Sequence, residues 1–459
     1  MTASERDSAA LIARLDRIPV WPYGNRLLVV IGAGYFFAYF DVVTIGLALP
    51  VITDQFGVSS KVAALAVTSS LAGYIVGAFI DSRIADTRGR RLSMMISVCV
   101  FTAGTLAAAA SPGIVWLIVF RFIAGMGIGA EIAAVTTYVG ELAPEKLRGR
   151  VTCIVGVMAF AGFAAVPLVG RFLIPAFDAG WRVLFVIGAA GGLTIAVLRR
   201  DMPASARWLL ARGHTADAER VISQAEARAR VITGRELPAP VAPIPADPGS
   251  QASLLRPPYV WLTALFTLIW MVYYLGNYGW LTLAPTLLTN HGFSLTSSLT
   301  FLVVTGTGFV VGAVVATVLA DRYDRRITTA LGALVWAGAL LAIGVIHGAA
   351  SVMFFGFIAS STIGFLVPLL YTYTAEHFPH QFRATGIAVT DGVGHLGGAA
   401  APLIVLTAAE VWGFTGAFMV MAGTGLVTAL LLIVLQIWWR AAAHTKQIAR
   451  PARSRNNRD

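Results

Sequence analysis

Asp41 is an ionisable residue near the middle of an apolar stretch, residues 27–50. A charged side chain at the centre of a membrane helix costs about 3 kcal/mol or more, so such residues are by default functional. Burial raises the pKa of a carboxyl group, whereas a nearby cation lowers it. A carboxylate whose contacts change can therefore bind and release a proton. Asp41 is therefore a candidate proton-coupling residue. The alternative is a fixed ion pair that only holds two helices together.

Arg121 and Glu131 lie in another apolar stretch, residues 114–139. They are ten residues apart, which corresponds to about 15 Å of helix rise. We interpret Glu131 either as a second proton site or as a ligand for a polar substrate. An equally good interpretation is that Glu131 faces a water-filled vestibule and has no functional role. Asp81 and Arg83 are expected to form a local ion pair.

Polar and aromatic side chains gather in the apolar stretch 259–282. Tyr274, Asn277 and Tyr278 fall on one helix face by their i, i+3 and i+4 spacing. Aromatic rings beside an amide suit a small organic ligand that stacks and hydrogen-bonds. Tyr and Trp also gather at membrane interfaces, which is the competing explanation.

Three residues of later apolar stretches complete the predicted substrate site. Tyr371 lies in the stretch 351–374, and Asp391 and His395 lie in the stretch 385–408. The spacing of four residues lets Asp391 and His395 touch on one helix. His395 is explained as well by packing against Asp391 as by a role as ligand or proton relay.

A charged pattern occurs twice in the chain, and all parts of its second copy follow the first at one constant offset. The sequence Glu141 to Arg150 ends one apolar stretch, and Glu376 to Gly386 ends its counterpart. The loop from Asp86 to Arg91 returns in the same way at Asp321 to Arg326. Pro50 and Pro167 match Pro285 and Pro402 at this offset. The two halves are therefore predicted to be homologous six-helix units, which usually enclose a substrate site between them.

The repeated charges have a mainly conformational interpretation. Glu141 can meet Arg88, Arg90 or Arg91, and Glu376 can meet Arg325 or Arg326. Contacts that close the cytoplasmic side of the protein, and break when that side opens, bias a two-state equilibrium. The alternative is that they only anchor loops. The predicted gating residues are Asp86, Arg88, Arg90, Arg91, Glu141, Arg148, Asp321, Arg325, Arg326, Glu376 and Arg383.

The composition places the chain in a bilayer. Of 459 residues, 57% are apolar and 12% are charged, with a mean hydropathy of +0.76, whereas a soluble domain carries about 25% charged residues. The net charge of +11 is interpreted as a basic cytoplasmic face and not as a nucleic-acid surface. The two cysteines, Cys99 and Cys153, support neither a disulfide framework nor a metal site.

Twelve apolar windows are long enough to cross the hydrocarbon layer. We predict a cytoplasmic segment at 1–26, a six-helix bundle at 27–199, a linker with surface helices at 200–257, a second bundle at 258–437 and a basic tail at 438–459. The loops on one side hold eleven cations and those on the other side three. The positive-inside rule therefore predicts that both termini are cytoplasmic.

With these motifs the chain resembles the major facilitator superfamily of secondary transporters. Its loop signature is matched by Asp86, Gly89, Arg90 and Arg91. RFxxGxGxGxE at 121–131, ExxPxxxRGR at 141–150 and ExFPxxxRAxG at 376–386 are typical of the sugar-porter and aromatic-acid or metabolite:proton symporter branches. PASARWL at 203–209 is similar to the PESPRWL stretch of those branches.

The resemblance implies an all-α membrane protein with twelve transmembrane helices in two pseudo-symmetric six-helix bundles. It implies that Arg121 is the partner of Asp41, and we expect both to face a wet cavity between the halves. Where aromatic-acid and niacin-like symporters often carry an Arg in helix eleven, this chain has His395, which is a cation only when protonated.

The predicted function is proton-coupled uptake of a small organic metabolite by alternating access. Protons are the coupling ion and no other cofactor is expected. The expected partners are the substrate and the lipid bilayer of the inner or plasma membrane, without nucleic acid, and one chain is expected to suffice. A proton-antiport exporter and a non-transporting nutrient sensor are the alternatives. An enzyme is not expected, because no nucleophile, metal or nucleotide motif is present.

Overall fold

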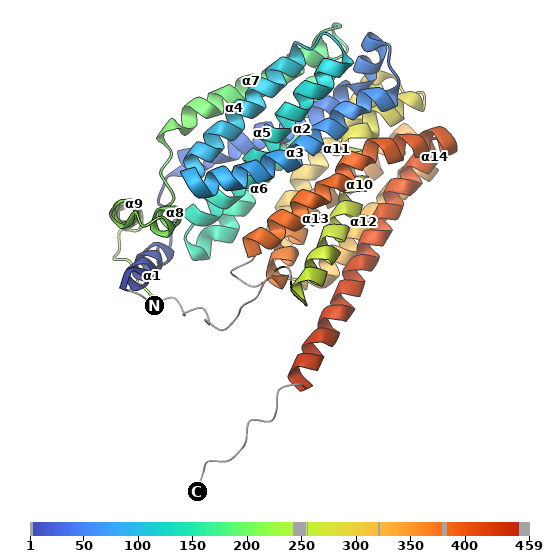
Figure 1. Cartoon of the computed structure of the whole chain (residues 1–459). Coiled ribbons are helices and arrows are strands. Elements are labelled where there is room, and N and C mark those ends of the chain that lie inside the picture. The colour runs from blue at the N-terminus through green and yellow to red at the C-terminus, as the bar shows by residue number, and fades with distance from the viewer. Residues whose placement is uncertain (1–2, 242–253, 255, 320–321, 379–382, 449–459) are drawn as a thin grey trace.

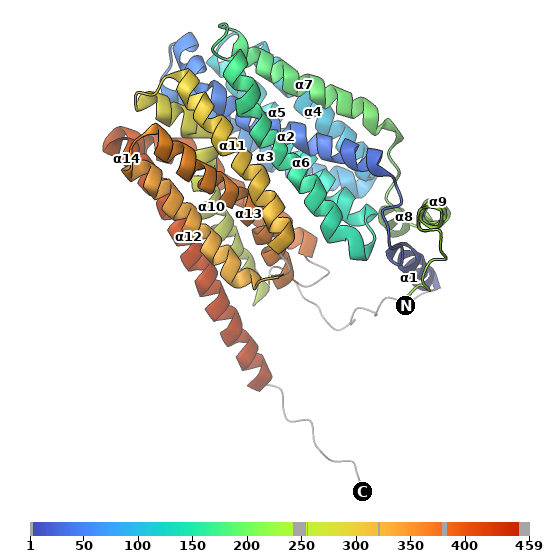
Figure 2. The same ribbon diagram turned by 180° about the vertical axis from the view of Figure 1, so that it is seen from behind.

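The chain folds into two side-by-side bundles of long helices (Figures 1 and 2). The computed structural model describes residues 3–241, 254, 256–319, 322–378 and 383–448, without the side chains of residues 3–6, 383–384 and 439–448. Within this part of the chain the regular elements are all helical, as the sequence predicts. The N-terminal bundle consists of α2 (Asn25–Phe56), α3 (Ser60–Arg88), α4 (Arg90–Ala109), α5 (Ile114–Leu142), α6 (Arg148–Leu173) and α7 (Gly180–Leu198). The C-terminal bundle consists of α10 (Tyr259–Asn290), α11 (Leu295–Leu319), α12 (Arg325–Val345), α13 (Ala349–His377) and α14 (Arg383–Ile448).

The twelve predicted spans are confirmed once the break in α14 is recognised. Eleven helices of the described chain are long and apolar enough to cross a membrane. Gly413 of α14 has φ 69° and ψ −166°, outside the helical region, and φ > 0 is readily adopted by glycine. The parts of α14 before and after Gly413 correspond to two of the twelve predicted windows, the first of them 385–408.

The internal repeat is visible in the helix boundaries. The first residues of α3 and α11, Ser60 and Leu295, are separated by the same offset as Glu141 and Glu376. The starts of α4 and α12, of α5 and α13, and of α6 and α14 keep this offset without exception. The insertion-free spacing means that equivalent helices occupy equivalent positions in the two halves. The prediction of two homologous six-helix bundles is therefore confirmed.

Glycines let helices within each half approach to backbone contact, as their small-residue spacing indicates. A Cβ atom added to Gly125 or Gly129 of α5 would collide with the carbonyl oxygen of Ser70 or Tyr74 in α3. A Cβ added to Gly397 of α14 would collide in the same way with Met271 of α10. These contacts hold α5 against α3 and α14 against α10.

The two halves meet along α2 with α10, α3 with α14, and α6 with α11. The Thr68 hydroxyl of α3 donates to the carbonyl oxygen of Ala399 in α14 at 2.8 Å. At the end of α3 opposite the loop of Asp86, Lys61 forms an ion pair with Glu410 of α14 at 2.5 Å. The interface between the halves therefore includes polar contacts at these two points.

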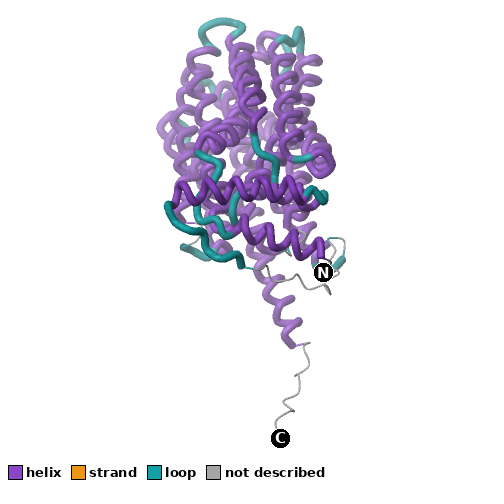
Figure 3. Tube along the Cα trace, turned by 90° about the vertical axis from the view of Figure 1, so that its left-hand side faces the viewer, coloured by secondary structure: helices purple, strands orange, loops and turns teal. Residues whose placement is uncertain are grey.

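Short helices cover the other end of the N-terminal bundle. They are α1 (Ala3–Asp16), η1 (Glu145–Leu147), η2 (Arg199–Asp201), α8 (Ala206–Ala211) and α9 (Thr215–Thr233). Figure 3 shows helices at this end running across the ends of the bundle helices. Leu15 and Ile18 pack with Leu209 and Ile222 in a separate apolar core, so α1 is held on the linker helices.

A buried carboxylate fixes α1 to α9. The side chain of Glu226 in α9 is 5% exposed and accepts hydrogen bonds from Arg14 Nη2 at 2.9 Å and Arg17 Nη2 at 2.6 Å. Burial by itself would raise the pKa of Glu226, but the hydrogen bonds and charges of Arg14 and Arg17 outweigh it and lower the pKa below the ordinary value. Glu226 is therefore ionised at neutral pH.

Replacing Glu226 by Gln is expected to loosen α1, because Arg14 and Arg17 lose a charged acceptor. Charge-assisted hydrogen bonds contribute about 1.5–3 kcal/mol, so hydrogen–deuterium exchange of the α1 amides should rise by about tenfold or more. The matched control is Glu219→Gln. Glu219 also contacts Arg14, at 3.3 Å, but is 58% exposed, and exposed pairs contribute little.

Acid should reproduce the effect of Glu226→Gln. The folded-state pKa of Glu226 is depressed, so the stabilisation is present at neutral pH and is lost as the pH falls through that pKa, below the ordinary carboxyl range. Exchange rates of α1 that stay constant in Glu226→Gln, and in the wild type under acid, would refute the role of this contact.

Candidate functional site

Asp41 and Arg121 form a fully buried ion pair between α2 and α5. Arg121 Nη1 donates to Asp41 Oδ2 at 2.6 Å, and the side chains of Arg121 and Asp41 are 0% and 1% exposed. The other carboxylate oxygen accepts from Thr105 Oγ1 at 3.1 Å, and Arg121 Nη2 donates to Ser70 Oγ at 3.1 Å. The guanidinium carbon lies 5.3 Å from the ring centre of Phe185. The pairing implied by the resemblance is therefore present.

The position of this pair differs from the expectation that both residues face the cavity between the halves. All their side-chain partners named above belong to helices of the N-terminal bundle, and neither residue lines the central cavity described below. Ser70 is the connection, because it lines a small adjoining cavity together with Tyr74 and Tyr278. The physical reason is that the interior of one bundle lets several helices supply hydrogen bonds to both members of the pair.

Glu131 belongs to a second buried ion pair, with Arg199 of η2. Arg199 Nη1 and Nη2 donate to the two carboxylate oxygens at 2.8 and 2.5 Å. Ser97 Oγ donates to the same carboxylate at 2.7 Å, and a Cβ atom on Gly34 would collide with both members of the pair. The two-pronged geometry fixes Glu131 firmly and joins α5 to the end of α7.

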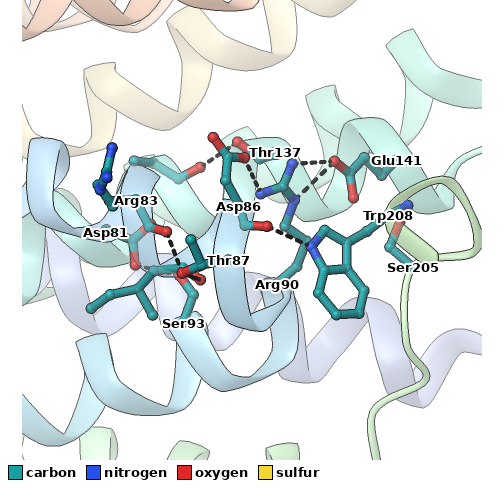
Figure 4. A network of polar contacts seen from close by, with 12 residues as sticks. Asp81, Arg83, Asp86, Thr87, Arg90, Ser93, Thr137, Glu141, Ser205 and Trp208 are labelled. Carbon is teal, nitrogen blue, oxygen red and sulfur yellow. Dashed lines mark hydrogen bonds and ion pairs between the residues drawn. The ribbon is translucent and has the colours of Figure 1, made fainter. Parts of the chain in front are cut away.

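Asp81 is buried, but its partner is not the predicted one. Ser93 Oγ of α4 donates to Asp81 Oδ1, while the Arg83 side chain is exposed and lies in no ion pair of the described residues. Figure 4 shows the Arg83 side chain directed away from the Asp81 carboxylate. The expectation of a local pair was wrong, because residues two apart on a helix point in different directions.

The central cavity lies between the two halves and is lined mainly by aromatic rings. The N-terminal half supplies rings from α2, α3 and α6, and the C-terminal half supplies rings and polar groups from α10, α13 and α14. Its polar and aromatic lining residues are Tyr39, Tyr74, Phe160, Phe163, Tyr274, Asn277, Tyr278, Tyr371 and His395. Five of the six predicted substrate residues line this cavity, and the sixth, Asp391, contacts three of them.

Asp391 organises the polar side of the cavity, and its closest side-chain partners are neutral. The hydroxyls of Tyr274 and Tyr371 donate to Asp391 Oδ1 at 2.6 and 2.7 Å. His395 Nδ1 lies 2.8 Å from the backbone oxygen of Asp391 and 3.8 Å from its carboxylate. The His395 ring stacks on Tyr74 of the opposite half, with ring centres 4.0 Å apart and planes at 19°. His395 therefore bridges the halves at the cavity.

The cavity is small. Its volume of about 40 Å³ holds only a few water molecules. A ring-sized solute therefore requires the Tyr74–His395 contact or a neighbouring contact to separate. The arrangement can bind a solute only together with a movement of the halves, which is the behaviour needed for alternating access.

The first clasp, which we define as Asp86, Arg90 and Glu141, joins α3, α4 and α5 (Figure 4). Arg90 donates to Glu141 Oε1 through Nε at 2.9 Å and to Asp86 Oδ1 through Nη1 at 2.7 Å. Among the three arginines predicted as partners of Glu141, the structure selects Arg90; Arg88 and Arg91 are exposed.

The linker helix α8 is attached to this clasp. Ser205 caps α8 by accepting from the backbone N–H of Trp208. Trp208 Nε1 donates to the backbone oxygen of Asp86 at 3.1 Å, and its ring covers Gly89. Arg207 donates to the backbone oxygen of Glu141 at 3.2 Å and to Asp16 at 2.6 Å. The stretch similar to PESPRWL is thus a connector between clasp, linker and α1.

The second clasp, Arg325 with Glu376, joins α12 and α13 in the C-terminal half. Arg326 lies beside it, and its backbone N–H is capped by Asp324. Asp321 and the side chain of Arg383 lie outside the described residues, and Arg148 begins α6. Both clasps connect helices of one half, so each of these contacts stiffens a bundle and does not itself bridge the two halves.

Some residues of the site were not predicted from the sequence. Arg199 was included only as the last residue of the predicted bundle 27–199, although an arginine at the end of an apolar span can reach back into the bundle. Tyr39 and Tyr74 are single aromatic residues in apolar helices, without a pattern that distinguishes them from packing. Tyr39 does occupy the position equivalent to Tyr274 in the internal repeat. The repeat could therefore have identified Tyr39 as a cavity residue.

Comparisons with known proteins agree with this architecture. The niacin transporter NiaP of Acinetobacter baylyi is 27% identical over 436 residues, which cover 93% of this chain and 96% of that protein. The 4-hydroxybenzoate transporter PcaK of the same species is 27% identical over 417 residues, covering 86% and 87%. The structure of the major facilitator superfamily proton:xylose symporter XylE with bound 6-bromo-6-deoxy-D-glucose aligns with a TM-score of 0.71 at 18% identity, covering 90% of this chain and 95% of XylE.

The family model described as sugar (and other) transporter matches residues 27–439. This match covers both bundles, the clasps and the linker between them. The chain therefore belongs to the sugar (and other) transporter family and has the major facilitator fold, and it is an integral membrane transporter and not an enzyme.

Proposed function

We propose that this protein couples proton movement to the uptake of a small organic solute across the cell membrane. The observation that carries the proposal is the buried Asp41–Arg121 pair, which is separated from the central cavity by Ser70 and Tyr74. Protonation of Asp41 would release Arg121 and change the packing of α3, which lines the cavity. Movement of the halves is thereby linked to the charge on Asp41.

The solute that fits the cavity best is a small ring compound. Tyr74, Tyr274, Tyr278 and His395 offer ring faces, and Asn277 offers both a donor and an acceptor. The names of NiaP and PcaK, a niacin and a 4-hydroxybenzoate transporter, agree with such a ring. Among the described residues, those that line the cavity include no Lys or Arg, so a carboxylate solute would rely on protonated His395.

The conformational cycle would use the halves as rigid bodies. The two clasps stiffen the ends of α3 to α5 and of α12 to α13, while Lys61–Glu410 holds the opposite ends of the halves together. The excess of basic residues in the loops at this end supports a cytoplasmic position of the clasps, both termini and the linker. One chain contains the cavity and both ion pairs, so the functional unit would be a monomer.

Asp41→Asn is expected to abolish accumulation driven by a pH gradient while leaving exchange intact, because Asn cannot carry a proton. The measurement is uptake and counterflow of labelled nicotinate and 4-hydroxybenzoate in proteoliposomes. Ser70→Ala is the control, since it removes a hydrogen bond of Arg121 but no titratable group. Gradient-driven accumulation by well-folded Asp41→Asn would contradict coupling at this residue, and expulsion in everted vesicles would indicate an exporter.

Tyr274→Phe is expected to raise the apparent KM for the transported probe by about tenfold, because Asp391 loses a hydrogen bond worth about 1.5 kcal/mol. The control Tyr273→Phe removes the hydroxyl of the neighbouring residue on the same helix, which does not line the cavity. Initial uptake rates over a range of probe concentrations measure both variants. Equal effects of the two substitutions would argue against a substrate site at Asp391.

We assign Glu131 a structural role in place of proton coupling, because its pairing with Arg199 is two-pronged and buried. Glu131→Gln should destabilise the protein by about 3–5 kcal/mol, since it leaves a buried guanidinium without a charge partner. The double variant with Arg199→Gln should recover part of this loss. Thermal unfolding in nanodiscs gives the comparison, and a Glu131→Gln variant of native stability with a shifted pH profile of uptake would favour the proton role instead.

A further inference from the structure

A pocket separate from the central cavity lies at the end of the N-terminal bundle, where α2 begins and α7 ends. Its volume is about 360 Å³, which is large enough for a phosphate group with a small polar substituent. One wall is apolar and comes from Leu27, Val30 and Leu198, while Arg26 of α2 and Arg228 of α9 stand at its polar side. The pocket is therefore amphipathic and lies where the membrane helices meet the linker.

The charge around the pocket is positive. Arg26 and Arg228 are exposed, and neither forms an ion pair or side-chain hydrogen bond with the described residues. The acidic member of the lining is Asp201, so one arginine charge remains uncompensated. The first turn of α2 adds to this field, because Gly24 provides no side-chain cap for its free N–H groups.

Tyr23 supplies a neutral donor at the same place. Burial raises the pKa of the Tyr23 hydroxyl to about 12, although the charges of Arg207 and Arg228 act in the opposite direction. The hydroxyl is therefore protonated at neutral pH. Two guanidinium groups and a phenol are suitable donors for the oxygens of one phosphate.

One apolar lining residue of the pocket, Leu198, is 38% exposed at the outer surface of the bundle. Val29, beside the lining residue Val30, is 56% exposed, and Val197, beside the lining residue Leu198, is 49% exposed. In a membrane protein such valines face acyl chains. Figure 2 shows α9 at the outer edge of the N-terminal bundle, close to the end of α7. A molecule in this pocket would thus have its polar part under α9 and an apolar part along α2 and α7.

We propose that this pocket binds the headgroup of an anionic phospholipid of the cytoplasmic leaflet, with its phosphate between Arg26 and Arg228 and its acyl chains over Val29 and Val197. Basic pockets beside membrane helices on the cytoplasmic side bind such headgroups. The bound lipid would connect α9 to α2 and hold the linker helices on the bundle. The choice of leaflet rests on the orientation proposed above, whereas the pocket itself does not depend on transport.

The test compares the full chain in nanodiscs of phosphatidylcholine alone and of phosphatidylcholine mixed with phosphatidylglycerol. Retained phosphatidylglycerol is counted by native mass spectrometry, and thermal unfolding is followed in both mixtures. We expect the wild type to retain phosphatidylglycerol and to unfold at a higher temperature with it. Arg26→Gln/Arg228→Gln should reduce this retention by about tenfold or more, with unchanged unfolding in phosphatidylcholine.

The matched control is Arg220→Gln/Arg235→Gln, which loses the same charge at exposed positions that do not line the pocket. It should behave like the wild type. Equal retention by the wild type and the pocket variant would overturn the proposal. Inorganic phosphate in phosphatidylcholine nanodiscs that reproduces the stabilisation would also overturn it, because the site would then belong to a soluble phosphate. Neither measurement needs substrate or a pH gradient, so a failure of proton-coupled uptake leaves the lipid result unaffected.

Discussion

The cost of placing charge inside a membrane bundle is the constraint on which this structure depends. An unpaired charge in that environment is strongly unfavourable, and a pair is tolerated only when further hydrogen bonds complete it. Asp41 with Arg121 and Glu131 with Arg199 meet this condition, with Thr105, Ser70 and Ser97 as additional partners. The hydroxyls on α3 and α4 therefore contribute to stabilising the buried charges.

The internal repeat extends to the scaffold but not to these buried charges. The prolines, the loop arginines and the clasp glutamates recur in the second half, whereas the positions equivalent to Asp41 and Arg121 are Gly276 and Gly356. In the opposite direction, Asp391 and His395 correspond to Gly156 and Phe160. One half therefore holds the buried ion pairs and the other half holds the polar side of the cavity. The scaffold is therefore symmetric, whereas its charged and polar residues are not. This arrangement lets a change of charge in the N-terminal half be followed by a movement of the C-terminal half.

The fold could be predicted from the sequence because its causes are local and repeated. Apolar windows of sufficient length set the spans, and the offset of Glu141 and Glu376 showed the duplication. The pairing of Asp41 with Arg121 came from the resemblance. Arg199 and Ser70 could not be assigned, because what makes them important is the three-dimensional approach of α7 and α3 to α5. Asp81 illustrates the same limit. Its partner Ser93 lies on the next helix and is brought close by the turn between α3 and α4, so spacing along one helix could not predict the contact. The contact of Tyr74 with His395 across the halves likewise depends on the three-dimensional packing.

The attachment of α8 to the first clasp explains how the linker between the bundles can matter to a site inside the membrane. Trp208 and Arg207 hold backbone oxygens of Asp86 and Glu141, which lie at the ends of α3 and α5. These two helices pack through Gly125 and Gly129 with no space for a Cβ atom, so they cannot slide independently. α3 also carries Ser70 and Tyr74, and α5 carries Arg121 and Glu131. A rigid α3–α5 unit thus extends from the linker through both ion pairs to the ring of His395. A movement at the cavity must displace this unit as a whole, and stiff units of this kind are what rocking between two states requires.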